Sequence, residues 1–290
     1  MDKEHFDIVI VGAGLSGIGT ACRLQQECPG KRYVILESRD TIGGTWDLFR
    51  YPGIRSDSDM HTLGYDFKPW TSHTAIAEGP AILDYLKETA AEHDVEQHIR
   101  FGHRVINASW NSVDASWSIE VRRAGTEDSV TVRCNFLLMC AGYYRYDHSH
   151  TPEFPGRDRF NGPIIDPQHW PEQLDYSGKR VVIVGSGATA ATLLPAMAET
   201  AEHVVMLQRS PTYFIPMPRD DVIASVLGKL LPAKTAYSLT RRKNIALQRW
   251  IYRQTRKNPE RVKRFLLWWA QKQLGPDYND LEKHFVPSYN

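Results

Sequence analysis

The sequence has few cysteines and no long apolar run. Its four cysteines form neither a disulfide framework nor a zinc-binding pattern, so we expect no metal site and inert thiols, buried at Cys22, Cys134 and Cys140. No stretch of about 18 apolar residues is present, which excludes a membrane-spanning helix. The charged start, residues 1–5, leads directly into an apolar run and is not typical of a signal peptide. We therefore expect a cytoplasmic protein.

The sequence also lacks a net charge of either sign. Its 35 Lys and Arg residues nearly balance 34 Asp and Glu residues, so no overall field attracts nucleic acid, and no nucleic-acid partner is expected. The charge is unevenly spread, because residues 219–290 contain 15 Lys and Arg but only 6 Asp and Glu. The length of 290 residues, with 42% hydrophobic residues, is enough for two cores.

Two glycine-rich loops are the most informative feature that is present. They read Gly12-Ala13-Gly14-Leu15-Ser16-Gly17 and Gly185-Ser186-Gly187-Ala188-Thr189-Ala190. Each follows a short apolar run typical of a buried parallel strand and precedes an alanine-rich helical stretch. Backbone N–H groups of such a loop can hold a pyrophosphate at the helix N-terminus. Two such loops predict that two dinucleotides bind, as in an enzyme that passes a hydride from nicotinamide to flavin.

The residues after each second strand distinguish the two dinucleotides. Glu37 follows Gly17 by 20 residues, where a carboxylate accepts both ribose hydroxyls of an adenosine and repels a 2′-phosphate. The first site is therefore expected to take FAD or NAD rather than NADP. In the second unit no acid is present at this place, and Arg209 and Ser210 can bind a 2′-phosphate, which favours NADP(H).

The remaining pattern predicts an α/β fold with two Rossmann-like, three-layer dinucleotide-binding domains. Residues 1–150 are expected to form the first domain, 151–218 the second, and 219–290 a basic helical insert. Short strands near 99–110, 116–122 and 129–133 predict a small β meander. Two further elements are expected, a loop at 41–60 and a buried strand at 136–141.

The lack of a suitably placed cysteine pair excludes one class of enzyme, the flavoprotein disulfide reductases. Flavoprotein disulfide reductases share the layout of two nucleotide-binding units, but they need a redox-active cysteine pair soon after the first ribose-binding acid. No cysteine lies between Cys28 and Cys134.

Two stretches between and beside the loops resemble a known family. The first is Gly43-Gly44-Thr45-Trp46-Asp47-Leu48-Phe49-Arg50-Tyr51-Pro52-Gly53-Ile54-Arg55-Ser56-Asp57, and the second is Phe160-Asn161-Gly162-Pro163-Ile164-Ile165-Asp166-Pro167-Gln168-His169-Trp170-Pro171. Together they resemble the flavin-dependent Baeyer-Villiger monooxygenases, in particular the ethionamide-monooxygenase type. In that family NADPH reduces FAD, O2 adds at flavin C4a, and the resulting peroxide inserts oxygen into a ketone or oxidises a sulfur compound.

The resemblance implies a role for each matched residue. FAD contacts are expected at the first loop (Gly12, Gly14, Ser16, Gly17) and at Glu37, Thr45, Trp46, Asp47 and Val105. Arg55, Ser56 and Asp57 are expected to face the flavin and the nicotinamide, with Arg55 and Asp57 catalytic. NADP is expected at Gly185, Ser186, Gly187, Ala188, Thr189, Ala190, Ala191, Arg209 and Ser210.

Two departures from the family pattern stand out. Asp166 occupies the fingerprint position of a histidine that links cofactor-domain motion to turnover, so impaired coupling to NADPH is one expectation and a tolerated change is the other. The family's active-site arginine follows a stretch that this chain begins, from His284 to Asn290. The resemblance therefore implies that both nucleotide domains are incomplete. The chain is expected to be a truncated form or the N-terminal piece of a split enzyme, with a complementing C-terminal polypeptide. The alternative is an inactive FAD- and NADP-binding remnant.

The basic segment allows two interpretations. Arginine and lysine alternate with large apolar residues over 241–272, and the run 265–269 reads Phe-Leu-Leu-Trp-Trp. One interpretation is a helical insert whose cationic faces are solvated. The other is a surface that contacts a membrane or another anionic partner.

Overall fold

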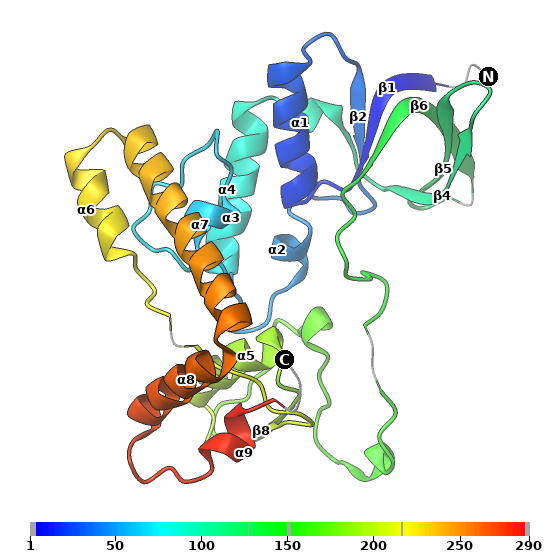
Figure 1. Ribbon diagram of the computed structural model, residues 1–290. Coiled ribbons are helices and arrows are strands. Elements are labelled where there is room, and N and C mark those ends of the chain that lie inside the picture. Colours follow the sequence, from blue (N-terminus) through cyan, green and yellow to red (C-terminus); the bar gives the residue numbers. More distant parts are fainter. Residues whose placement is uncertain (1–3, 127, 150–151, 216, 288–290) are drawn as a thin grey trace. The chain divides into compact units, whose positions relative to one another are not determined.

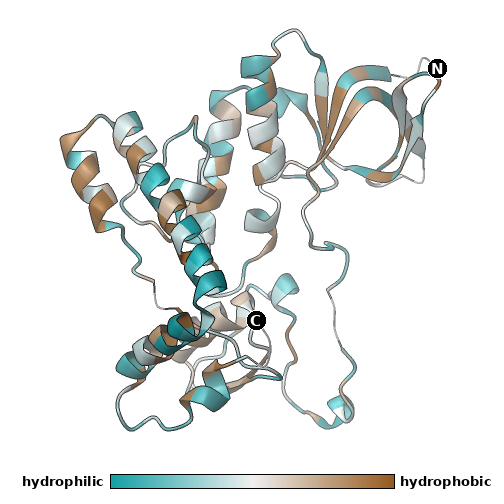
Figure 2. Ribbon diagram, in the orientation of Figure 1, coloured by the Kyte–Doolittle hydropathy of each residue, from teal (hydrophilic) through white to brown (hydrophobic). Residues whose placement is uncertain are grey.

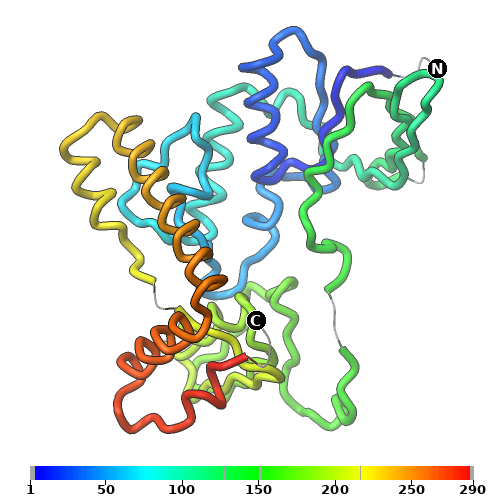
Figure 3. Tube along the Cα trace, in the orientation of Figure 1, coloured from blue at the N-terminus to red at the C-terminus, as the bar shows by residue number. Residues whose placement is uncertain are grey.

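The computed structural model describes residues 4–126, 128–149, 152–215 and 217–287. The chain divides into two compact units, each built from two segments (Figures 1 and 3). Unit 1 comprises Met1–Arg50 and Gly79–Pro171, and unit 2 comprises Tyr51–Glu78 and Glu172–Asn290. The division into domains expected from the sequence stays a prediction.

Unit 1 contains a six-stranded sheet in the order β3-β2-β1-β6-β5-β4. Its strands are β1 (Glu4–Val11), β2 (Tyr33–Leu36), β3 (Ile99–Arg100), β4 (His103–Asn111), β5 (Ser116–Arg123) and β6 (Ser129–Met139). The first four strands of this order pair in parallel, and β6, β5 and β4 pair antiparallel as a meander. The mixed sheet confirms the α/β fold and the meander.

The meander differs from expectation in one respect. The strands predicted near 129–133 and at 136–141 form one continuous strand, β6, because its first half pairs with β5 and its second half with β1. Register pairs such as Val9 with Leu137 extend the parallel sheet along this second half.

Helices α1 (Leu15–Glu27), α2 (Thr45–Leu48) and α4 (Gly79–Glu92) complete unit 1. Helix α1 buries a stripe of small and apolar residues (Gly17, Ile18, Gly19, Ala21 and Cys22), which allows it to pack closely on β1 and β2. Helix α2 lies within the segment 41–60 that the sequence predicted as a loop. Short 3-10 turns, Glu96–His98, Arg157–Arg159 and Pro167–His169, occur in the connections.

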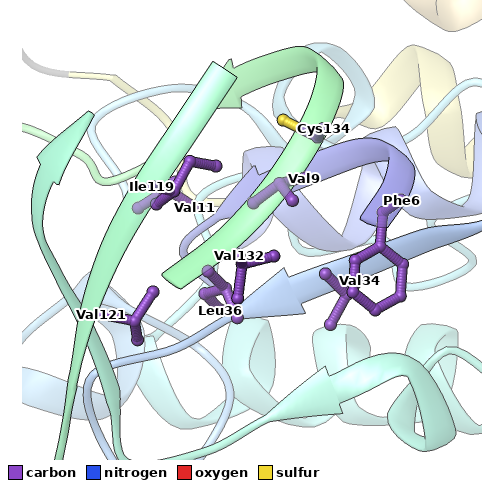
Figure 4. Packing of buried hydrophobic residues seen from close by; sticks show 9 residues of the cluster. All are labelled: Phe6, Val9, Val11, Val34, Leu36, Ile119, Val121, Val132 and Cys134. Carbon is purple, nitrogen blue, oxygen red and sulfur yellow. The ribbon is translucent and has the colours of Figure 1, made fainter. Parts of the chain in front are cut away.

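The core of unit 1 joins the parallel strands to the meander (Figure 4). Its buried members are Phe6, Val9, Val11, Val34, Leu36, Ile119, Val121, Val132 and Cys134. Residues of β1 and β2 therefore pack in one core with those of β5 and β6.

Unit 2 contains the second strand–loop–helix unit, in β7 (Arg180–Val184), α5 (Ala188–Ala198) and β8 (His203–Leu207). The two strands are parallel, with Val182 opposite Val205. Helix α5 buries Leu193 and Met197 and packs on both strands. This parallel pair with its crossover helix confirms the second Rossmann-like unit.

The other helices of unit 2 are α3 (Met60–Leu63), α6 (Val222–Leu230), α7 (Ala233–Lys257), α8 (Pro259–Leu274) and α9 (Leu281–Phe285). Helix α7 packs against α3 and α6. Asp59 caps α3 by accepting the N–H of Thr62 at 3.1 Å, and its Oδ1 accepts the side-chain amide of Asn244 on α7 at 2.8 Å. Arg241 donates to the carbonyls of His61 and Gly64 at 2.8 Å each. Polar groups thus fasten the first half of α7.

His61 is an exception among these contacts. Its side chain is 3% exposed, and neither ring nitrogen has a hydrogen-bond partner among the residues that the structure describes. Burial lowers the pKa of His61, and Asp59 and Asp221 oppose this shift only in part. The imidazole is therefore held in its neutral form.

The cysteines lie largely as expected. Cys22 and Cys134 are buried, Cys140 is half-buried and Cys28 is exposed, and all four are free thiols. Burial raises the pKa of Cys22 to about 11, which suppresses the reactive thiolate. Over the described ranges no helix is both long and apolar enough to cross a membrane.

Candidate functional site

The first glycine-rich loop makes two turns that side chains would obstruct. Gly12 has a φ of 103°, and a Cβ there would lie 2.5 Å from the carbonyl oxygen of Cys140. A Cβ on Gly17 would lie 1.9 Å from the carbonyl oxygen of Gly12, so only glycine lets α1 begin this close to the loop. Helix α1 starts at Leu15, with Gly14 as its N-cap. The loop therefore leads directly into the N-terminus of a helix, which is the end that attracts an anion.

Glu37 lies against this loop at the end of β2. Its side chain is 4% exposed, and Oε2 accepts the backbone N–H of Ala13 at 2.7 Å. The backbone N–H of Arg39 donates to Oε1 at 2.9 Å. Oε1 also accepts the hydroxyl of Ser38 at 3.3 Å. These bonds fix the orientation of the carboxylate, and Oε2, which accepts one hydrogen bond, keeps acceptor capacity for a ribose hydroxyl.

The segment that carries Thr45, Trp46 and Asp47 is joined to the first loop through its backbone. Gly43 N–H donates to the carbonyl of Ala13 at 3.0 Å. A Cβ on Gly44 would lie 3.2 Å from the Cα of Gly14, so the two glycines let the chains approach closely. Helix α2 begins directly afterwards and places Thr45, Trp46 and Asp47 beside the loop.

Arg39 is a site residue that the sequence analysis missed. Its Nη2 donates to the buried Asp47 at 2.6 Å, and its Nη1 donates to the carbonyl of Gly44 at 3.4 Å. Arg50 binds the other Asp47 oxygen at 3.1 Å. The two arginines compensate the charge of a carboxylate that burial would otherwise destabilise. The only signal in the sequence was that this arginine follows Glu37 by two residues.

Val105 lies two residues into β4, next to the same edge of the sheet. His103 N–H donates to the carbonyl of Glu37 at 2.8 Å, which brings the start of β4 beside the end of β2. The register of β4 against β5 shifts between Val105 and Asn107. The half-buried Val105 side chain packs against the hydrophobic core.

Arg55, Ser56 and Asp57 belong to unit 2. Arg55 forms an antiparallel bridge with Glu78, and Ser56 N–H donates to the carbonyl of Ala77 at 2.9 Å. Ser56 is buried, whereas Arg55 and Asp57 are exposed on either side of it. The extended backbone thus anchors the central residue and turns the two flanking charges outward.

The second glycine-rich loop is fastened to the residues after β8. Gly185 has a φ of 133°, and its N–H donates to the carbonyl of Leu207 at 2.9 Å. Ser186 Oγ donates to the carbonyl of Ser210 at 3.0 Å. Helix α5 begins at Ala188 with Gly187 as its N-cap, so Ala188, Thr189, Ala190 and Ala191 form its first turn. The loop and the Arg209–Ser210 pair are therefore neighbours.

Gln208 is a second residue that the sequence analysis missed. Its Oε1 is buried and has no hydrogen-bond partner among the described residues. Arg209 next to it is exposed, and its guanidinium forms no ion pair with any residue that the structure describes. An unpartnered acceptor and a free cation beside a phosphate-binding loop fit the hydroxyls and the 2′-phosphate of a nucleotide.

Asp166, at the position of the fingerprint histidine, has a defined structural role in unit 1. It caps a 3-10 turn by accepting Gln168 N–H at 3.0 Å, and it accepts the hydroxyl of Ser149 at 2.5 Å. His169 Nδ1 lies 2.7 Å from the same carboxylate, and this hydrogen bond raises the pKa of His169. Asp166 thus joins Ser149 to the turn at Pro167–His169.

The stretch that begins at His284 is described only in part. Helix α9 includes His284 and Phe285, and Val286 and Pro287 follow it. Ser288, Tyr289 and Asn290 lie outside the described residues.

The chain is similar to flavin monooxygenases in sequence and in structure. It is 52% identical over 288 residues to the FAD-containing monooxygenase EthA of Mycobacterium tuberculosis, covering 99% of this chain and 58% of that relative. An oxidized steroid monooxygenase bound to NADP superposes with a TM-score of 0.68 at 32% identity, over 82% of this chain and 44% of that one. A cyclohexanone monooxygenase from Rhodococcus sp. Phi1 bound to NADP+ gives 0.66 at 28% identity, over 79% and 43%.

The chain spans less than two thirds of the length of each of these proteins. The model of the flavin-binding monooxygenase-like family matches residues 5–259, which includes both glycine-rich loops and the segments between them. On this match, and with the geometry of both loops in agreement, the chain belongs to the flavin-binding monooxygenase-like family.

Proposed function

We propose that this chain is the FAD- and NADPH-binding part of a Baeyer-Villiger-type monooxygenase. Such an enzyme inserts one oxygen atom of O2 into a ketone or oxidises a sulfur compound. One observation carries the proposal: the two glycine-rich loops lie beside different residues. These are Glu37 at the first loop, suited to ribose hydroxyls, and Arg209 at the second, suited to a 2′-phosphate. When bound, FAD would supply the chemistry that activates O2, once NADPH has reduced the flavin.

In the first site the residues of unit 1 would bind and orient FAD. Gly12, Gly14 and Gly17 let the backbone approach the pyrophosphate, and Glu37 accepts ribose hydroxyls. Two observations support the fit of these residues to FAD. A Cβ on Gly12 or Gly17 would clash with the backbone, and two backbone N–H groups fix the orientation of the Glu37 carboxylate.

In the second site the residues of unit 2 would bind NADPH. The first turn of α5 holds the pyrophosphate, and Arg209 with Ser210 holds the 2′-phosphate. The unpartnered Gln208 oxygen supports this assignment, because a buried acceptor without a donor is costly until a ligand supplies one.

Arg55 and Asp57 are proposed as the catalytic residues of this part. Their side chains are exposed while Ser56 between them is buried and bonded to Ala77. A carboxylate so placed can orient a cation, and the Arg55 guanidinium can stabilise negative charge that develops on the substrate oxygen.

The test is to bind FAD to the purified chain and to follow its absorbance when NADPH is added without oxygen. Bleaching by NADPH supports two functional nucleotide sites. Admission of air with a ketone or a thioether should then yield an oxygenated product. A chain that binds no FAD contradicts the proposal, and one that bleaches but forms only hydrogen peroxide contradicts oxygen insertion by this chain.

A complementing C-terminal polypeptide is the second part of the proposal. The β7–β8 sheet is covered by α5 on one side, while Val182, Val184 and Leu207 on its other side are each more than half exposed. An apolar sheet face of this kind is typical of a surface that another segment covers. The C-terminal part of the EthA relative, expressed separately, should then restore turnover to a chain that only binds FAD and NADPH. The alternative, an FAD- and NADP-binding remnant, predicts no such rescue.

A further inference from the structure

The two halves of α7 have different surroundings. In the first half Ala236, Tyr237, Thr240 and Asn244 are buried on one face. From residue 246 to residue 258 every side chain is exposed except those of Gln254 and Thr255, which are half-buried. The last three turns of α7 therefore contribute little to the core of unit 2. Packing in that core does not explain why large apolar residues occur there.

One side of this exposed half is apolar. Leu247, Trp250 and Ile251 have the spacing of neighbours on one helix face, and Trp250 is 58% exposed. On α8, Phe265 and Trp268 repeat the pattern, with ring centroids 6.0 Å apart and Trp268 59% exposed. Figure 2 shows hydrophobic and hydrophilic residues alternating along this part of α7 and along α8. Large exposed aromatic groups of this kind usually mark a binding surface.

The adjoining positions are cationic and uncompensated. Arg249, Arg253 and Arg256 follow one another at helical spacing, and Lys257 lies next to the last of them. No ion pair joins any of these four to a carboxylate among the described residues. By contrast Lys243, on the packed half of α7, binds Asp221 at 2.7 Å. The charge on the exposed half is thus not used for internal stability.

We propose that this basic-aromatic surface, formed by Leu247, Arg249, Trp250, Ile251, Arg253, Arg256, Lys257, Phe265 and Trp268, lies on an anionic lipid bilayer. The apolar side chains enter the boundary between headgroups and acyl chains, and the cations contact lipid phosphates. Leucine and isoleucine beside tryptophan favour a bilayer over a nucleic acid, which offers no apolar layer. With no helix in the described part able to cross a membrane, the contact lies in the plane of the surface.

The proposal is tested by sedimentation of the whole chain with vesicles of phosphatidylcholine alone or with added phosphatidylglycerol. Binding should require phosphatidylglycerol and fall with rising salt, since exposed charges are screened. The double variant Arg249→Glu and Arg253→Glu should weaken binding at least tenfold, because each cation near an anionic surface contributes about fivefold. The double variant Trp250→Ala and Trp268→Ala should weaken it as strongly and abolish the blue shift of tryptophan fluorescence.

Matched controls lie in unit 1. Arg122→Glu with Arg123→Glu makes the same change of net charge at two exposed arginines of β5, and Trp110→Ala removes another exposed tryptophan. Both should bind as the unchanged chain does. Four results would overturn the proposal: no binding at low salt, equal binding to phosphatidylcholine alone, equal losses in the controls, or self-association of the chain through this surface in the absence of vesicles.

Discussion

The backbone N–H of Ala13 donates a 2.7 Å hydrogen bond to Oε2 of Glu37. This bond joins the turn of the first glycine-rich loop to the carboxylate that ends β2. Together with the bond from Arg39 N–H to Oε1, it fixes the orientation of the carboxylate that we propose accepts the ribose hydroxyls. The arrangement exists in the chain by itself, so the proposed FAD site would be preorganised.

Replacement of Glu37 by glutamine should therefore weaken FAD binding by about tenfold to a hundredfold, the range expected for hydrogen bonds to a charged group. An amide offers one acceptor oxygen where two are used. Flavin fluorescence titration measures the dissociation constant. Glu27→Gln, at the exposed end of α1, should leave it unchanged. If the Glu37 variant bound FAD with the same affinity as the unchanged chain, the Glu37 carboxylate would not be part of the FAD site.

Gly17→Ala should lower the free energy of unfolding of unit 1 by about 1–3 kcal/mol, the usual cost of overpacking. Its Cβ would lie 1.9 Å from the carbonyl oxygen of Gly12, so the loop or α1 must move. Urea denaturation monitored by circular dichroism gives the shift. Gly30→Ala is the matched control, since a Cβ there meets nothing within 4 Å and should change stability by less than about 0.5 kcal/mol.

Arg209→Ala should raise the dissociation constant of NADP+ by about tenfold or more and leave that of NAD+ nearly unchanged. The Arg209 guanidinium is the group expected to bind the 2′-phosphate, which NAD+ lacks. Calorimetric titration of both nucleotides measures the difference. Arg180→Ala, at the exposed start of β7, is the control. Equal weakening of the two nucleotides would show that Arg209 does not read the 2′-phosphate.

His61 should make the stability of unit 2 depend on pH. Burial lowers the pKa of His61 in the folded chain below its unfolded value of about 6.5, so the unfolded chain binds the proton more readily. Stability contributed by the neutral ring is complete above about pH 6.5 and is lost as the pH falls from there toward the folded pKa.

The variant His61→Phe removes this titration. It should also raise the free energy of unfolding by about 1 kcal/mol at neutral pH, since it deletes two buried nitrogens without partners. Urea titrations at several pH values between about 5.5 and 7.5 measure both effects. His73→Phe, at an exposed position of the same unit, should keep the pH dependence of the unchanged chain. A persistent slope in the His61 variant would assign it to another group.

Much of the fold was predictable from short stretches, as were the positions of the two glycine-rich loops. A strand, a glycine-rich turn and a helix follow one another within about 25 residues at each loop, and local periodicity reports such units. Hence β1, α1, β2 and β7, α5, β8 were predicted, as were Glu37 and Arg209. The segment around α2 was recognised by its motif but its helix was not predicted, because one turn has too few residues to show a period.

Local sequence by itself determined where the two dinucleotide loops lie and which residue follows each second strand. The tertiary structure alone decided which distant groups complete them. Arg39 meets Asp47 because α2 folds back on the loop, and Asn244 meets Asp59 across 185 residues of chain. Likewise the buried oxygen of Gln208 and the buried ring of His61 have no hydrogen-bond partner among the described residues, which only the tertiary structure reveals. Burial and hydrogen bonding depend on all spatial neighbours of a residue. The residue pattern along one strand or helix gives no information about neighbours that are distant in the sequence.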